Sequence, residues 1–255
     1  MEILENPFLI FMISAAAQSL AAYAGDFLRT RGYALGPDDR EDFNLVRGAA
    51  LTLLALIIGF SFSMAITRYD QRKNYEEAEA NAIGTEYARA DFLPADDAAN
   101  VRENLSGYVD QRILFYITRD QAQVRQIDAD TAKLQANLWS VTSRAAMAHP
   151  TPVVALAVSG MNDVINSQGY SQAAWWNRIP AAAWGLMGLI AISCNFLIGY
   201  GDHRARSLIL SILPIIVSIS FFLIADIDSP RGGVINVHPQ NLIATSQFIK
   251  SQKPL

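Results

Sequence analysis

Residues 59–84 read GFSFSMAITRYDQRKNYEEAEANAIG. The first nine residues are uncharged and suit a lipid bilayer, whereas those from Arg68 to Glu79 are rich in acidic and basic side chains. No Gly or Pro lies between Phe60 and Ile83. Because Gly and Pro are the residues that most disfavour a helix interior, we expect one continuous helix to leave the apolar phase and enter water.

Three other apolar stretches accompany this one. Of the 255 residues, 51% are hydrophobic and 17% are charged, against about 25% charged residues in a typical soluble domain. Stretches without Asp, Glu, Lys or Arg cover residues 7–25, 48–67, 179–201 and 207–225. About 20 apolar residues cross the hydrocarbon core of a bilayer as a helix. The sequence therefore predicts an all-α integral membrane protein with four transmembrane helices in the lipid bilayer.

The first apolar stretch has two interpretations. Residues 21–25, AAYAG, resemble the cleavage site of a signal peptide. A secretory signal begins with basic residues, but Glu2 and Glu5 precede this stretch, and Arg29 and Arg31 follow it. We therefore expect it to be kept as the first span.

The residues between the second and third spans have a helical pattern. Apolar residues recur there at three- and four-residue spacing, which is typical of one face of a helix. They are Val101, Leu105, Tyr108, Val109 and Ile113; Leu134, Leu138 and Val141; and Val154, Val158, Met161, Val164 and Ile165. Breaks are expected at Pro94 and at residues 148–152 and 166–170.

This pattern divides the chain into four parts. Residues 1–67 hold the first pair of spans, and residues 68–178 form a helical extramembrane module. Residues 179–229 hold the second pair of spans, and residues 230–255 form a carboxyl-terminal tail.

Small and polar residues line one face of the second span and its extension. Gly59, Ser63, Thr67 and Asp70 follow one another at spacings of three and four, and Asn74, Glu77, Asn81 and Thr85 continue the row. Small residues permit close approach of helix backbones in a membrane. This stripe packs either against helices of its own chain or against another copy.

Beside this stripe, two pairs of opposite charges occur at a spacing of four. We expect Arg72 with Glu76 and Lys73 with Glu77 to pair on a solvated surface.

Two motifs resemble those of the bacterial bestrophin-like domain family of four-span membrane proteins. SFSMAITRYDQRKNYEEAEANAIGTEYARADFLP (residues 61–94) resembles the family's junction after span two, with Tyr69, Asp70, Glu79 and Asn81 in its motif. ADIDSPRGGVINV (residues 225–237) is similar to the family's exit from the last span. The resemblance covers nearly the whole chain and implies four spans with a helical insert.

A more distant resemblance is to the bestrophins, which are pentameric anion channels with a pore lined by their second span. It rests on the span layout and on Ala65, Arg68 and Tyr69; Arg72 and Lys73 replace the paired tryptophans of that family. The resemblance implies a homo-oligomeric ion channel or transport module, with Ile57, Phe60 and Met64 as candidates for an apolar constriction. The alternative is a structural or regulatory membrane subunit whose helical module binds a protein partner.

The charges near the span ends predict an orientation. Arginines are concentrated in the two short loops opposite the module, at Arg29, Arg31, Arg40, Arg47, Arg204 and Arg206. The positive-inside rule assigns such loops to the cytoplasm. The module then lies outside the bacterial inner membrane. Basic residues on the module's own side oppose this assignment; they are Arg68, Arg72, Lys73, Arg178 and Arg231.

Other chemistries have little support in the sequence. His149, His203 and His238 lie in separate segments without the spacing of a zinc site. Neither a phosphate-binding glycine loop nor a Gly-x-Ser-x-Gly motif occurs, and a net charge of −4 without a basic stripe disfavours nucleic acid. We expect no enzyme and no cofactor.

Asp226 and Asp228 are either a site for a hard cation such as Ca²⁺ or charges at a helix end.

Overall fold

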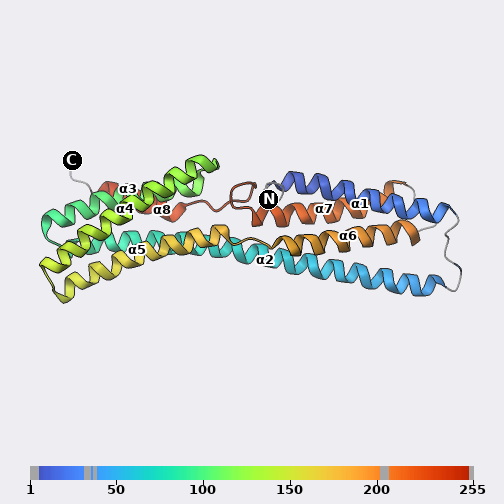
Figure 1. Ribbon diagram of the computed structural model, residues 1–255, viewed down its shortest axis with the longest axis horizontal. Coiled ribbons are helices and arrows are strands. Elements are labelled where there is room, and N and C mark those ends of the chain that lie inside the picture. The colour runs from blue at the N-terminus through green and yellow to red at the C-terminus, as the bar shows by residue number, and fades with distance from the viewer. Residues whose placement is uncertain (1–5, 32–35, 37–38, 202–206, 253–255) are drawn as a thin grey trace. The chain divides into compact units, whose positions relative to one another are not determined.

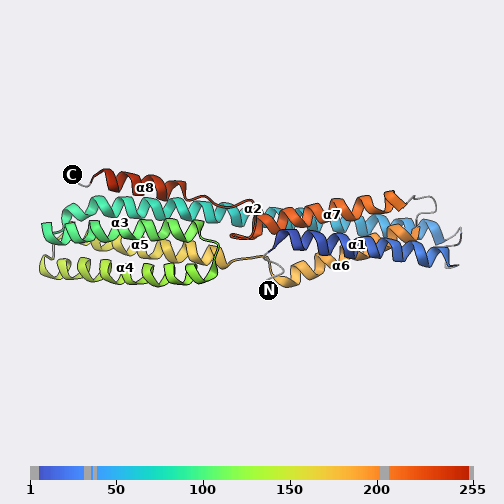
Figure 2. The same cartoon turned by 90° about the horizontal axis from the view of Figure 1, so that it is seen from above.

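The computed structural model describes residues 6–31, 36, 39–201 and 207–252, and these residues form helices and no strand (Figures 1 and 2). The chain divides into two compact units. The membrane unit comprises Met1–Arg68 and Arg178–Asn236, and the module unit comprises Tyr69–Asn177 and Val237–Leu255. Arg204 and Arg206, which contribute to the predicted orientation, lie outside the described residues.

Four helices build the membrane unit. They are α1 (Pro7–Thr30), the first part of α2 (Asp39–Arg89), α6 (Ala181–Gly201) and α7 (Ser207–Asp228). Helix α1 lies alongside both α6 and α7 (Figure 1). The described residues contain four segments that are helical, long and apolar enough to cross a membrane, and each of these four helices holds one of them. The four predicted spans are confirmed.

Glycines bring α1 and α6 into close contact. A Cβ atom on Gly199 would overlap the carbonyl oxygen of Ala22, and a Cβ atom on Gly25 would overlap that of Phe196. Only glycine fits at these two positions, since the obstacle in each case is backbone. This is the small-residue packing that holds helices together in lipid, where apolar side chains have no preference for each other over acyl chains.

Helix α2 is continuous from Asp39 to Arg89. The expectation that one helix runs through the junction at residues 59–84 is therefore confirmed. The helix begins earlier than the predicted span, which starts at residue 48. Asp39, Glu41 and Asp42 occupy its first turn, where carboxylates interact favourably with the helix dipole.

The module unit contains the rest of α2 and five further elements. They are the 3₁₀ helix η2 (Ala90–Phe92), α3 (Ala95–Ile117), α4 (Gln121–Ala148), α5 (Pro152–Trp176) and α8 (Gln240–Ser251). Helix α3 packs against α4 and α8, and α4 packs against α5 (Figure 2). The helical periodicity of the middle residues is confirmed, since Val101, Leu138 and Met161 are fully buried in one core.

The breaks between these helices follow local chemistry. Asp120 caps α4, because its carboxylate accepts hydrogen bonds from the backbone N–H groups of Ala122 and Gln123. Thr151 caps α5 through the N–H of Val154. The sequence pattern missed the break before α4.

The break expected at residues 166–170 was wrong, because α5 continues to Trp176. A glycine inside a helix costs only about 1 kcal/mol. Burial of the large Trp175 side chain on the same helix offsets that cost.

The carboxyl-terminal segment belongs partly to the module unit. Glu76 of α2 holds the start of α8: its Oε1 accepts a hydrogen bond from the backbone N–H of Leu242 (2.9 Å) and its Oε2 accepts one from Asn241 Nδ2 (2.7 Å). Leu242 and Ile249 are fully buried. Helix α8, which the sequence pattern placed in a tail, therefore contributes to this core through Leu242 and Ile249.

Candidate functional site

The small and polar stripe of α2 is exposed along its whole length. Gly59, Ser63 and Thr67 are exposed in the membrane unit, and a Cβ atom on Gly59 would have no neighbour within 4 Å. Asp70 and the other stripe positions are exposed in the module unit; these are Asn74, Glu77, Asn81 and Thr85. The stripe is thus available to a partner outside the chain.

The candidate constriction residues lie beside this stripe. Phe60 is 65% exposed and Met64 is 42% exposed. Ile57 is half-buried and packs against the core of the membrane unit. Phe60 and Met64 are four positions apart on one helix, so they present an apolar surface next to Ser63.

The opposite face of α2 carries buried charges in the module unit. Arg72, Glu76, Glu79 and Glu86 are each at most 2% exposed. The expectation that Arg72 and Glu76 lie on a solvated surface was therefore wrong, whereas Lys73 and Glu77 are exposed. The charged row of the sequence has two faces, one buried and one solvated.

Glu79 is the centre of a buried polar network. Its carboxylate pairs with the guanidinium of Arg112 on α3, and both side chains are fully buried. Arg112 Nη2 also donates a hydrogen bond to Ser171 Oγ on α5 (3.0 Å), and the guanidinium lies 4.4 Å from the centre of the Phe115 ring. This network joins α2, α3 and α5.

Burial and the Glu79 charge together shift the pKa values of the surrounding groups. Burial lowers the pKa of Arg112, but the carboxylate of Glu79, together with Tyr108 and Tyr116, raises it by more, so the net pKa is raised. Burial, with the same carboxylate, raises the pKa of Tyr108 and of Tyr116. The arginine therefore stays charged and the two phenols stay neutral.

A second buried carboxyl has no comparable partner. Both oxygens of Glu86 are buried without a hydrogen bond in the structure. Burial raises the pKa of Glu86 to about 8; Arg89 counteracts this and Asp163 adds to it. A Cβ atom on Gly160 of α5 would overlap Glu86 Oε2, so the glycine provides the space for this carboxyl.

Asp226 and Asp228, the candidate cation site, have separate protein partners. Asp226 accepts hydrogen bonds from the backbone N–H groups of Val234 (2.7 Å) and Ile235 (2.8 Å). Asp228 accepts one from the N–H of Ile179 (3.0 Å) and pairs with Arg68 at 3.4 Å. Among the described residues no group of three or more potential metal ligands occurs. These contacts close a turn after α7 and connect it to the start of α6, without needing a cation.

Comparison with known proteins identifies the family. The family model of the Bestrophin-like domain matches residues 17–242. The chain belongs to the Bestrophin-like family. No curated protein matches the sequence.

Solved bacterial structures share the fold. A bestrophin homologue from Klebsiella pneumoniae is similar with a TM-score of 0.66 at 14% sequence identity, covering 97% of this chain and 99% of that one. Two point variants of that homologue give TM-scores of 0.66 and 0.63 at 12% and 13% identity. The first comparison covers 96% of this chain and 97% of the other, and the second covers 94% of both.

The motif residues of this Bestrophin-like chain lie on different faces of α2. Glu79 is buried in the network, and Tyr69 packs partly buried against the module core. Asp70 and Asn81 are exposed on the stripe. The structure therefore separates the motif into residues that hold the module together and residues available to a partner.

Several polar residues of the Bestrophin-like chain were missed by the sequence pattern. Arg112 lies four positions after Tyr108, on the same face of the helix as the apolar residues. A charged side chain on a face that is otherwise apolar indicates a buried partner. In the membrane unit, Gln18 of α1 donates to Ser218 of α7 (3.3 Å) and accepts from Asn195 of α6 (2.9 Å). Polar residues inside spans are rare and usually paired. The presence of Gln18 and Asn195 in the predicted spans was therefore a signal that they contact each other or another polar group.

Proposed function

We propose that the protein is a homo-oligomeric ion channel or transport module in which α2 borders the axis shared by identical copies. The observation that carries this proposal is the exposed face of α2 at Gly59, Ser63 and Thr67, beside Phe60 and Met64. Phe60 and Met64 are far larger and more apolar than the stripe beside them. A ring of copies would cover the small residues and bring the apolar ones together.

The chemistry of this face favours an apolar gate. Residues 48–67 contain no acidic or basic side chain, and proton-coupled transporters depend on ionisable residues within their spans. Hydrophobic constrictions close a pore by excluding water. Phe60 and Met64, with Ile57 behind them, have the size and polarity for such a constriction.

The proposal includes an orientation in the bacterial inner membrane. The arginines opposite the module favour a cytoplasmic position for the loop that joins α1 and α2. The module unit then lies in the periplasm, where its polar stripe would extend the lining of the assembly beyond the bilayer.

A second candidate function is a non-enzymatic subunit whose module binds another protein. The observation that favours it is the exposure of two large apolar side chains on α4, Trp139 at 42% and Met147 at 84%. Large aromatic residues and methionine are enriched at protein interfaces. A heteromeric complex is expected in this case, with no requirement for identical copies around α2.

Stoichiometry and ion flux distinguish the two functions. The mass of the purified protein in detergent should correspond to several identical chains, and vesicles that contain it should pass ions. Phe60→Ala should increase the flux because it removes an apolar barrier, while Phe8→Ala, which truncates an exposed phenylalanine of α1, should leave it unchanged. A monomer or a mixed complex without flux would contradict the channel and favour the subunit.

A further inference from the structure

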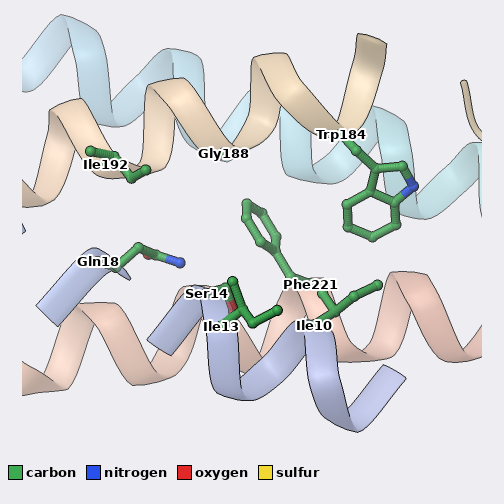
Figure 3. Close-up of a pocket in the computed structure, with 8 residues that line it drawn as sticks. All are labelled: Ile10, Ile13, Ser14, Gln18, Trp184, Gly188, Ile192 and Phe221. Carbon is green, nitrogen blue, oxygen red and sulfur yellow. The ribbon is translucent and has the colours of Figure 1, made fainter. Parts of the chain in front are cut away.

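The membrane unit contains a cavity of about 220 Å³ that the proposed channel does not use. Its eight lining residues come from α1, α6 and α7 (Figure 3). Ile10, Gln18 and Phe221 form a floor in which each residue is less than 10% exposed. Ile13 and Ile192 form an exposed rim. The cavity therefore leads from the surface of the unit to side chains that are otherwise buried.

The polar groups in the lining are already engaged within the protein. The Gln18 side chain donates to Ser218 and accepts from Asn195. The hydroxyl of Ser14 donates to the carbonyl oxygen of Phe11 at 3.1 Å. The other side chains in the wall are aliphatic or aromatic, and the ring of Trp184 on α6 meets that of Phe221 edge to face. A ligand that needs hydrogen bonds finds little here.

The size and the apolar lining of the cavity favour an apolar occupant. An engineered apolar cavity of about 150 Å³ stays free of water and binds benzene, and a buried water needs two to four polar partners. An empty space of this size also deprives its walls of dispersion contacts. The occupant should therefore be an apolar group about as thick as a single hydrocarbon chain.

We propose that the cavity binds one acyl chain of a membrane phospholipid, which enters between Ile13 and Ile192. The three helices that line it are candidate spans, so acyl chains are the medium that surrounds the opening. A second copy of the protein is a poorer candidate, because α2, which carries the stripe assigned to self-association, contributes no residue to the lining. The inference holds whether or not the protein conducts ions.

Two glycines of α6 provide a matched pair of variants. A Cβ atom on Gly188 or on Gly185 would have no neighbour within 4 Å. Gly188 lines the cavity, whereas Gly185 is exposed outside it. Gly188→Leu should fill the cavity, and Gly185→Leu should leave it open. Both replacements change the helix propensity of α6 equally, so a difference between them reports on the cavity.

The experiment is photolabelling in vesicles of phosphatidylethanolamine and phosphatidylglycerol that contain a phosphatidylcholine with a diazirine on one acyl chain. Mass spectrometry then compares the label on the buried floor residues Ile10 and Phe221 with that on Leu189, which is 64% exposed on α6. Lipid that only surrounds the protein labels Leu189. An inserted chain labels the floor as well.

The native protein and Gly185→Leu should both carry the floor label, and Gly188→Leu should lose it while it keeps the label on Leu189. Gly188→Ala places a smaller side chain in the same cavity and should reduce the floor label partly. An unlabelled floor in the native protein would overturn the proposal, as would a floor label that Gly188→Leu and Gly188→Ala leave unchanged. Disulfide-linked dimers of an Ile13→Cys variant would identify a second copy as the occupant and overturn it too.

Discussion

Glu79 on α2 and Arg112 on α3 form an ion pair in which neither side chain is exposed to solvent. Folding removes both charges from water, and the attraction between the carboxylate and the guanidinium compensates for their lost hydration. A buried pair of this kind contributes little net stability, but the loss of one partner leaves an uncompensated buried charge. The pair therefore makes the packing of α3 on α2 sensitive to a single substitution.

Glu79→Gln should strongly destabilise the module unit. Breaking a buried ion pair costs about 3–5 kcal/mol, because Arg112 would remain charged without its carboxylate. The apparent melting temperature of the purified protein, followed by tryptophan fluorescence, measures the effect. Glu77→Gln is the control, since Glu77 is exposed two positions away on the same helix. Equal melting temperatures for the two variants would show that the pair is dispensable.

Glu86 should make the stability of the protein depend on pH. The pKa of its carboxyl is about 8 in the folded chain, against 4.5 for an ordinary glutamate side chain. Between these values the folded protein holds a proton that the unfolded chain has released, so stability falls as the pH rises through this window and levels off above it. Below the window both states are protonated, and the full stability is present.

Glu86→Gln removes this titration. Melting temperatures measured between about pH 5 and pH 8 should fall for the native protein and fall less for the variant, which should be the more stable of the two at the upper end. Glu77→Gln again serves as the control and should keep the native slope. If the melting temperature of Glu86→Gln falls with pH as steeply as that of the native protein, another group is responsible for the pH dependence.

Helix formation and the membrane spans could be predicted because they depend on local patterns. The four charge-free stretches and the apolar period around Leu105, Leu138 and Met161 are properties of short windows. The continuity of α2 likewise follows from the absence of Gly and Pro between Phe60 and Ile83. These features need no knowledge of what each helix packs against.

The partners of the buried charges could not be predicted because each partner is distant in sequence. Glu79 meets Arg112 across 33 positions, and Glu76 meets Leu242 across 166. A charged row on a helix has the same local pattern whether it faces water or another helix. The exposed stripe at Gly59 and Ser63 was visible as a row of small residues, but only the packing of the protomer shows which rows remain uncovered.

The side of the membrane on which the module lies can be tested at Gln123, which is exposed on α4. A cysteine introduced there should react with an impermeant maleimide in intact cells whose outer membrane has been opened. Asn44→Cys, at an exposed position near the start of α2, should react only after lysis. The native cysteine, Cys194, is buried in the membrane unit and should contribute little background. The reverse labelling pattern would place the module in the cytoplasm.

The self-association of α2 can be tested at Ser63, which is exposed in the protomer. Ser63→Leu adds bulk to the small face at the point where two copies are proposed to meet. Overpacking typically costs about 1–3 kcal/mol, and in a ring the same defect recurs at every interface. The assembly should therefore dissociate or change its stoichiometry, while each chain still inserts because its second span has become more hydrophobic. Native mass spectrometry of the detergent-solubilised protein measures this outcome.

Leu53→Ile provides the comparison for Ser63→Leu. Leu53 is 46% exposed on the same span, and the replacement conserves volume and polarity, so the assembly should stay intact. Because Ser63 is exposed, we expect a disturbance caused by leucine there to come from outside the chain. An unaltered oligomer with Ser63→Leu would therefore mean that the stripe faces lipid or solvent. The proposal that α2 borders a shared axis would then lose its physical basis.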